Sequence, residues 1–165
     1  MNYQNITVDD MLNGDGLRTV LWVSGCMHHC RGCQNPQTWD AKSGIPFDEA
    51  AKEELFADLS RDYMDGITFS GGDPLCPVNR ETVGRLIAEI RDHFPQKTIW
   101  LYTGDLFESF RDTLPFLPLI DVIVDGPYVE ALRDVNLCWR GSKNQRVIDV
   151  KQTLATGKVV LWARN

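Results

Sequence analysis

The chain has 165 residues, of which 43% are hydrophobic and 24% charged, and its formal net charge at pH 7 is −6. This length predicts one domain over residues 1–165 with a substantial core. The negative charge argues against a general nucleic-acid-binding surface, and no run approaches the roughly 18 apolar residues that span a membrane. The first seven residues lack a basic region and an apolar run, which predicts a cytoplasmic protein without a signal peptide.

The first predicted strand, residues 19–23, runs directly into a loop with three cysteines. Cys26, Cys30 and Cys33 are separated by three and then by two residues. The chain has five cysteines, an odd number, and this crowding favours a metal site over a disulfide framework in a reducing compartment. Three thiolates from one loop can hold three of the iron corners of a [4Fe–4S] cluster and leave the remaining iron free to bind a reactant.

A structural zinc site is the alternative interpretation of this loop. It would need a fourth ligand, for which His28, His29, Cys76 and Cys138 are the candidates. Structural zinc sites commonly use two separated pairs of ligands, and the sequence offers no clear second pair. The histidines are therefore interpreted as solvated loop residues or as donors to groups around the metal, and the two remaining cysteines as small buried residues or spectators.

Helical and strand patterns alternate after the cysteine loop. Apolar residues recur at helical spacing over 47–59 and 83–90, and Asn79 fits the N-cap of the second helix. The further predicted elements are strands at 66–70, 97–103 and 119–124, weaker strands at 146–150 and 159–162, and a short helix at 107–114. This alternation indicates an α/β fold with parallel strands and right-handed crossovers. The linker between the last two strands is too short for a helical crossover, so they form an antiparallel pair or one of them is not a strand.

Unusual residues follow each of the first four strands. The segments in question are the cysteine loop, Gly71-Gly72-Asp73-Pro74, Thr103-Gly104-Asp105 and Asp125-Gly126-Pro127. Because ligands of parallel α/β folds bind at the carboxyl ends of the strands, we expect these loops to converge on one face. In the second segment, adjacent glycines let the backbone approach a ligand closely, and exposed carbonyls together with the Asp73 carboxylate suit a ligand ammonium group.

A basic, polar segment lies near the end of the chain, from Arg140 to Arg146. Its glycine and its amide and guanidinium side chains could bind a carboxylate or a ribose. An ordinary solvated loop before a strand is the alternative. The segment from Asn13 to Arg18, before the first predicted strand, is by itself an ordinary turn.

Together these residues resemble a known family, the radical S-adenosylmethionine enzymes. The resemblance rests on the C-x3-C-x2-C spacing after a first strand and on the Gly-Gly-acid-Pro turn after a second. The segment from Asn13 to Arg18 and the segment from Cys33 to Trp39 are similar to the subgroup that activates glycyl radical enzymes. Within it the chain is most similar to activators of anaerobic ribonucleoside-triphosphate reductase, through the stretches Asn2-Tyr3, Ser70 to Pro74, Val124 to Gly126 and Trp139 to Gln145. Gln34 and Pro127 depart from the residues common in the subgroup.

The resemblance implies a fold, cofactors and a set of site residues. The fold would be a short core in the form of a partial, open TIM-like barrel of parallel strands with outer helices. Cys26, Cys30 and Cys33 would hold a [4Fe–4S] cluster, whose open iron binds the amino and carboxylate groups of S-adenosyl-L-methionine. The remaining residues carried over are Gly71, Gly72 and Asp73 for the amino group, Gly32, Cys33 and Gln34 for the adenine, and Arg140 and Asn144 for the nucleoside or carboxylate.

The resemblance also implies an activity and partners. Reductive cleavage of S-adenosylmethionine would give a 5′-deoxyadenosyl radical, which takes a hydrogen atom from a glycine of the large reductase subunit; a small flavin protein such as flavodoxin would supply the electron. No further catalytic side chain is expected, since the protein's part in such chemistry is to position the cofactor and exclude side reactions. The alternatives are a radical enzyme acting on another glycyl radical enzyme or a small molecule, and a zinc-stabilised binding module.

Overall fold

The computed structural model describes residues 1–163, so the last two residues of the range predicted as one domain lie outside it. Seven strands and four α-helices are present in these residues. The strands are β1 Asn2–Asp10, β2 Arg18–Val23, β3 Ile45–Pro46, β4 Gly66–Gly71, β5 Thr98–Tyr102, β6 Val122–Asp125 and β7 Arg146–Asp149. The helices are α1 Glu49–Leu59, α2 Pro77–His93, α3 Phe107–Phe110 and α4 Val150–Thr156. No helix among residues 1–163 is both long and apolar enough to cross a membrane.

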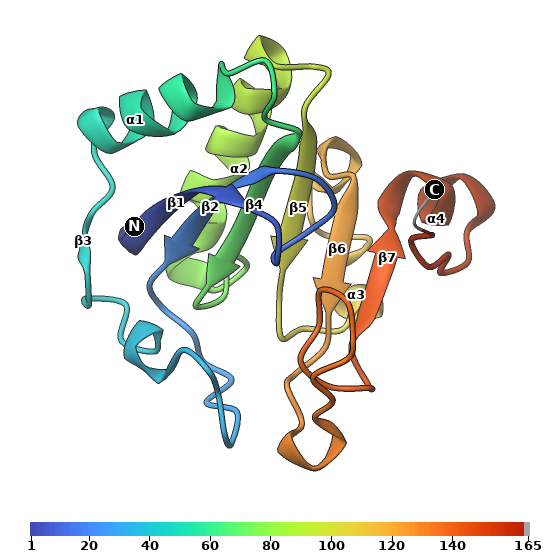
Figure 1. The fold of residues 1–165 in the computed structure, drawn as a ribbon. Coiled ribbons are helices and arrows are strands. Elements are labelled where there is room, and N and C mark those ends of the chain that lie inside the picture. Colours follow the sequence, from blue (N-terminus) through green and yellow to red (C-terminus); the bar gives the residue numbers. More distant parts are fainter. Residues whose placement is uncertain (164–165) are drawn as a thin grey trace.

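All seven strands form one open sheet in the order β3-β1-β2-β4-β5-β6-β7 (Figure 1). The four central strands β2, β4, β5 and β6 are parallel. β1 pairs antiparallel with β2, β3 with β1, and β7 with β6. The parallel α/β arrangement expected from the alternating pattern is therefore confirmed for the centre of the sheet. The carboxyl ends of the four parallel strands lie at one edge, where the long loops after β2 and β6 extend together (Figure 1).

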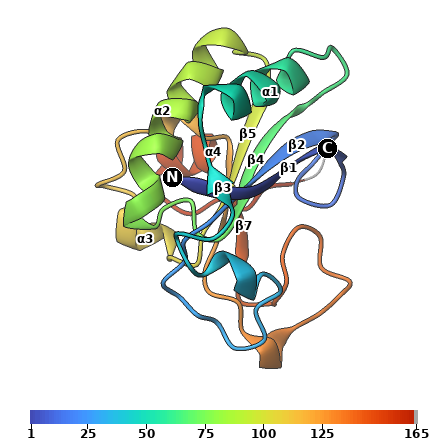
Figure 2. The same ribbon diagram turned by 90° about the vertical axis from the view of Figure 1, so that its left-hand side faces the viewer.

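The main hydrophobic core lies between the sheet and helices α1 and α2, which cover one face (Figure 2). Leu21 and Phe69 from the sheet are fully buried there, as are Leu55 of α1 and Ile87 of α2. Because side chains alternate along a strand, the intervening residues point to the opposite face. That face carries a second cluster in which Trp100 packs edge-to-face on Trp139 and Trp162, with ring centroids 5.1 and 5.8 Å away.

The structure differs from the sequence predictions at several elements. β1 was missed because its residues are mostly polar and Tyr3 alone among them is buried. Helix α4 was missed at residues 150–156, and 159–162 is not a strand, since it makes one isolated bridge, Leu161 with Ile148. Asn79 is not the N-cap: Cys76 holds that position, and Pro77 begins α2. The helix predicted over 107–114 ends at Phe110.

Asp121 joins three elements just before β6. Its carboxylate accepts hydrogen bonds from Arg91 of α2 at 2.6 Å and from the backbone N–H of Ile99 at 2.8 Å, and Lys151 of α4 lies 2.7 Å away. Burial works to raise the pKa of Asp121, but the hydrogen bonds from Lys151, Ile99 and Arg91 outweigh it and hold the pKa below the ordinary 3.8. This carboxylate therefore stabilises the fold only while it is ionised.

We expect Asp121→Asn to lower the free energy of unfolding by about 2 kcal/mol at pH 7, since charged hydrogen bonds are lost. Because the folded-state pKa is depressed below 3.8, the difference from the wild type is largest above pH 3.8 and shrinks as the pH falls from that value through the lower folded-state pKa. Urea unfolding at pH 7 and at about pH 3 measures both. Asp112→Asn, at a carboxylate whose side chain is 85% exposed, is the control and should change stability by less than about 0.5 kcal/mol. A difference at the acidic pH as large as the one at pH 7 would contradict this account.

Candidate functional site

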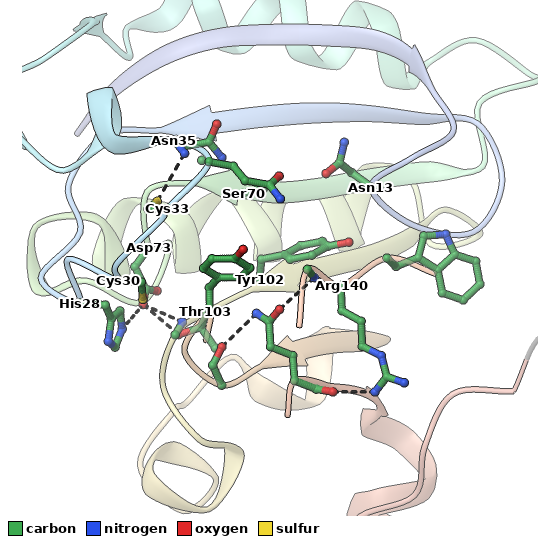
Figure 3. A pocket seen from close by; sticks show the side chains of 18 of the residues that line it. Asn13, His28, Cys30, Cys33, Asn35, Ser70, Asp73, Tyr102, Thr103 and Arg140 are labelled. Atoms are coloured by element: carbon green, nitrogen blue, oxygen red, sulfur yellow. Dashed lines mark hydrogen bonds and ion pairs between the residues drawn. The ribbon is translucent and has the colours of Figure 1, made fainter. Parts of the chain in front are cut away.

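A cavity of about 550 Å³ lies at the carboxyl ends of the parallel strands. Its lining comes from the loops after β2, β4, β5 and β6, from the turn between β1 and β2, and from the segment 133–145. The convergence of four loops expected from the sequence is confirmed. Figure 3 shows Cys30 and Cys33 at one end of this cavity and Asn13 and Arg140 at the other.

All three clustered cysteines line the cavity as half-buried free thiols. The loop that carries them is held by backbone hydrogen bonds, from Gly25 N–H to the carbonyl of Thr38 at 2.7 Å and from Cys26 N–H to that of Trp39 at 3.1 Å. Asn35 N–H donates to the sulfur of Cys33 at 3.3 Å. Burial raises the pKa of the Cys26 thiol. A positively charged metal centre would reverse this effect, because it favours the thiolate.

The three cysteine sulfurs do not all lie within 4.8 Å of one another in this structure. Three thiolates on one zinc ion, each about 2.3 Å from the metal, would lie roughly 3.8 Å from one another. Among residues 1–163, however, the one group of three potential ligand atoms within 4.8 Å of one another is His28, Asp73 and Asp105, which includes no cysteine. Three thiols on one loop that face a shared cavity have the number and type of ligands that an iron–sulfur cluster uses.

Gly71 and Gly72 pack directly against the strand that leads into the cysteine loop. Gly71 has a φ of +99°, and a Cβ atom there would lie 2.8 Å from the carbonyl oxygen of Val23. A Cβ at Gly72 would lie 2.6 Å from the carbonyl oxygen of Gly25. Gly72 N–H donates to Val23 and Asp73 N–H donates to Gly25, at 2.8 and 2.9 Å. The glycines therefore allow the turn after β4 to lie against the base of the cysteine loop.

The Asp73 carboxylate faces into the protein. The residue is 2% exposed, and its oxygens contact His28, Thr103, Gly104 and the N–H of Leu75. Asn79, which is fully buried in α2, joins the same region, because its side-chain amide donates to the carbonyls of Ser24 and Asp73 at 2.9 Å each. The sequence placed Asn79 at a helix end, where its role between the two loops could not be recognised.

Of the other site residues that the resemblance implies, some line the cavity and others do not. Cys33, Gln34 and Arg140 line the cavity, whereas Gly32 and Asn144 are not among its lining residues. Gly32 has a φ of +72°, and a Cβ there would lie 2.7 Å from a carboxylate oxygen of Glu130. Arg140 donates to the carbonyl of Gln145 at 2.6 Å, and Asn144 donates to that of Pro127 at 2.7 Å. Both side chains therefore also fix the loop that borders the cavity.

The two remaining cysteines lie outside this cavity. Cys76 is buried and lines a separate hollow of about 180 Å³, together with His28 and Arg80. Cys138 is exposed, so of the two alternatives offered for these cysteines a buried residue fits Cys76 and a spectator fits Cys138. Neither is among the residues that line the large cavity with the cysteine triplet.

The segment before β2 is fixed by a buried cation. Arg18 is fully buried and donates to the hydroxyl of Thr68 at 2.8 Å and to the carbonyl of Asp15 at 2.9 Å, while Thr68 donates to the carbonyl of Asn13 at 2.7 Å. Burial lowers the pKa of Arg18 to about 10, and its guanidinium lies 5.2 Å from the ring centroid of Trp100. These contacts hold Asn13 at the cavity wall.

Trp22, Ser70 and Tyr102 also line the cavity and were missed as site residues. They lie one position before the carboxyl ends of β2 and β4 and at the end of β5, and Trp22 pairs in register with Ser70. Burial raises the pKa of Tyr102 well above its usual value. The sequence did contain a signal for them. Each alternates along its strand with core residues of the helix-covered face, so its side chain is expected on the opposite face of the sheet.

Comparisons with known proteins agree with this geometry. Residues 12–148 match the family described as 4Fe-4S single cluster domain. An anaerobic ribonucleoside-triphosphate reductase-activating protein of Enterobacteria phage T4 is 46% identical over 147 residues, which are 89% of this chain and 93% of the relative. Proteins of the same name from Escherichia coli K12 and Haemophilus influenzae are 44% and 40% identical, over 89% and 88% of this chain and 97% and 96% of theirs. The chain belongs to the family of anaerobic ribonucleoside-triphosphate reductase-activating proteins.

Proposed function

We propose that this protein activates an anaerobic ribonucleoside-triphosphate reductase by generating a radical from S-adenosylmethionine. The observation that carries the proposal is the cysteine triplet, which faces one cavity together with the Gly71–Asp73 turn. A [4Fe–4S] cluster bound there supplies one-electron reductive cleavage of S-adenosylmethionine, whose 5′-deoxyadenosyl product takes a hydrogen atom from a glycine of the reductase. The chain's own residues bind and orient the cofactor and exclude water from the cavity.

The proposed roles involve residues that line the cavity, together with Gly32 and Asn144, which do not line it but lie on the same loops. Cys26, Cys30 and Cys33 hold the cluster. Backbone groups of the turn from Gly71 to Asp73 receive the amino group of the methionine part, and the segment from Gly32 to Gln34 faces the adenine. Arg140 and Asn144 border the nucleoside end. Support comes from the close packing of the glycine turn on the base of the cysteine loop, which puts both segments within reach of one ligand.

The reductase glycine has to reach the cavity for the hydrogen transfer. Among the described residues, Leu12 and Val135 are the two large apolar side chains that line the cavity and are also strongly exposed, at 80% and 79%. They come from the β1–β2 turn and from the β6–β7 loop. An apolar entrance of this kind suits an extended, uncharged segment of the partner.

The proposal has three further parts: the type of fold, the electron donor and the cellular compartment. The open sheet is a shortened TIM-like barrel, a description supported by its four parallel central strands with helices on one face. A small flavin protein such as flavodoxin supplies the electron. The protein works in the cytoplasm, in keeping with free thiols at all five cysteines.

The test is anaerobic reconstitution with iron and sulfide, followed by mixing with the reductase, S-adenosylmethionine and a reductant. We expect iron and sulfide in similar amounts, methionine as a product, and a glycyl radical on the reductase by electron paramagnetic resonance. Cleavage of S-adenosylmethionine without a radical on the reductase would reject the partner. One bound zinc without sulfide would reject the radical chemistry as a whole.

A further inference from the structure

Asp73 is bound by protein groups on both of its carboxylate oxygens. One oxygen lies 2.7 Å from Nε2 of His28, 3.0 Å from the hydroxyl of Thr103 and 3.1 Å from the N–H of Gly104. The other oxygen accepts from the N–H of Leu75 at 2.8 Å. An ionised carboxylate only accepts hydrogen bonds, so His28 must donate from Nε2. With these partners and 2% exposure, the Asp73 carboxylate acts on the protein around it and not on a ligand.

His28 makes a second contact that fixes its ring in place. A Cβ atom at Gly104 would lie 2.4 Å from Cδ2 of the imidazole, so the glycine after β5 leaves the space that the ring fills. The imidazole is thus held from two sides, by the carboxylate after β4 and by bare backbone after β5. Its side chain is 25% exposed. Figure 3 shows His28, Asp73 and Thr103 meeting at the cluster end of the cavity.

The position of His28 in the chain shows which two segments this contact joins. It lies two residues after Cys26 and two residues before Cys30, so the imidazole holds the middle of the cysteine loop. Asp73 is the last residue of the turn proposed to receive S-adenosylmethionine. The hydrogen bond between them therefore joins the segment that would hold the cluster to the segment that would hold its ligand.

We propose that His28 is a positioning residue, which sets the cysteine loop against the Gly71–Asp73 turn and so places S-adenosylmethionine correctly at the cluster. This inference rests on the proposed function. It also explains why His28, Asp73 and Asp105 lie close enough to resemble a metal site: Nε2 of His28 is also 3.6 Å from a carboxylate oxygen of Asp105, and a hydrogen-bonded imidazole between two carboxylates accounts for the group without an ion.

The experiment compares His28→Leu with His28→Gln in reconstituted, anaerobic protein. Leucine fills the space but cannot donate, whereas the glutamine side-chain amide can replace Nε2 as the donor to Asp73. The readout is the electron paramagnetic resonance spectrum of the chemically reduced cluster, titrated with S-adenosylmethionine. We expect His28→Leu to keep its iron and sulfide but to need about tenfold more S-adenosylmethionine for the spectral change, as is typical when a residue behind a metal site is removed. His28→Gln should recover most of the wild-type affinity.

The matched control is the neighbouring histidine. His29 is exposed, contacts Trp39 edge-on, and has a φ of +47°, so His29→Asn keeps a residue type that tolerates this conformation. It should titrate like the wild type. If His28→Leu cannot hold iron, Thr103→Val decides, because it removes a donor to the same carboxylate oxygen without changing the cysteine loop; weaker binding is again expected.

Two results would overturn the inference. One is a His28→Leu protein that titrates with S-adenosylmethionine as the wild type does, and the other is a His28→Gln protein no better than His28→Leu. Failure of the proposed function looks different, because the wild-type protein itself would then show no spectral change on addition of S-adenosylmethionine.

Discussion

Replacing Cys33 by alanine is expected to abolish both cluster binding and cleavage of S-adenosylmethionine. The three thiolates of the loop are the cluster ligands available on this side of the cavity, and two cannot retain a cluster whose fourth position is left to the substrate. The same loss is expected for Cys26→Ala and Cys30→Ala, since all three sulfurs face the same cavity. Iron and sulfide analysis after anaerobic reconstitution, with methionine release in the presence of dithionite, measures the effect.

The chain provides two matched controls for this experiment. Cys138→Ala removes an exposed thiol, and Cys76→Ala removes a buried one that lines a different hollow. Both variants should keep the iron, the sulfide and the rate of methionine release of the wild type. Full iron content in any variant of the triplet would contradict the assignment, as would a requirement for Cys76 equal to that for Cys33.

The sequence predicted the centre of the fold, and it placed the three candidate metal ligands on one loop, because both depend on local patterns. Buried parallel strands appear as short apolar runs, and three thiols within eight residues have few other uses. The sequence also placed the cysteine loop and the Gly71–Gly72 turn at the same edge of the sheet, because both follow parallel strands. That reasoning needed no knowledge of side-chain contacts.

What the sequence did not show depends on contacts between distant residues. β1 carries few apolar residues, because it is held by backbone pairing with β2 and buries little besides Tyr3. The sequence predicted Asn79 as a helix cap, which is wrong, and His28 as a loop residue, and their partners lie 55 and 45 residues away. A hydrogen bond across such a separation leaves no periodic signal along the chain. The positioning groups of the site therefore emerge only from the folded structure.

Gly71→Ala is expected to leave the cluster in place but to reduce cleavage of S-adenosylmethionine on the order of a hundredfold, as misplacement of bound reactants by about 1 Å can do. An alanine Cβ at this position would lie 2.8 Å from the carbonyl oxygen and 2.9 Å from the nitrogen of Val23. Val23 is paired on both sides, with Tyr3 of β1 and with Gly71 itself, so we expect the end of β4 and the turn after it to move instead. The cysteines lie on the other side of this contact, and their sulfurs keep their positions.

The matched control separates this displacement from ordinary backbone strain. Gly157 also has a positive φ, +72°, but a Cβ there would meet nothing within 4 Å. Gly71 has a φ of +99°, so each alanine incurs a left-handed backbone cost of about 1–2 kcal/mol. Only the substitution at Gly71 also pushes against backbone. Methionine release with dithionite, iron content and the urea midpoint should therefore show lost cleavage for Gly71→Ala and lowered stability alone for Gly157→Ala. Equal losses of cleavage in the two variants would mean that global stability, and not the position of the turn, limits the reaction.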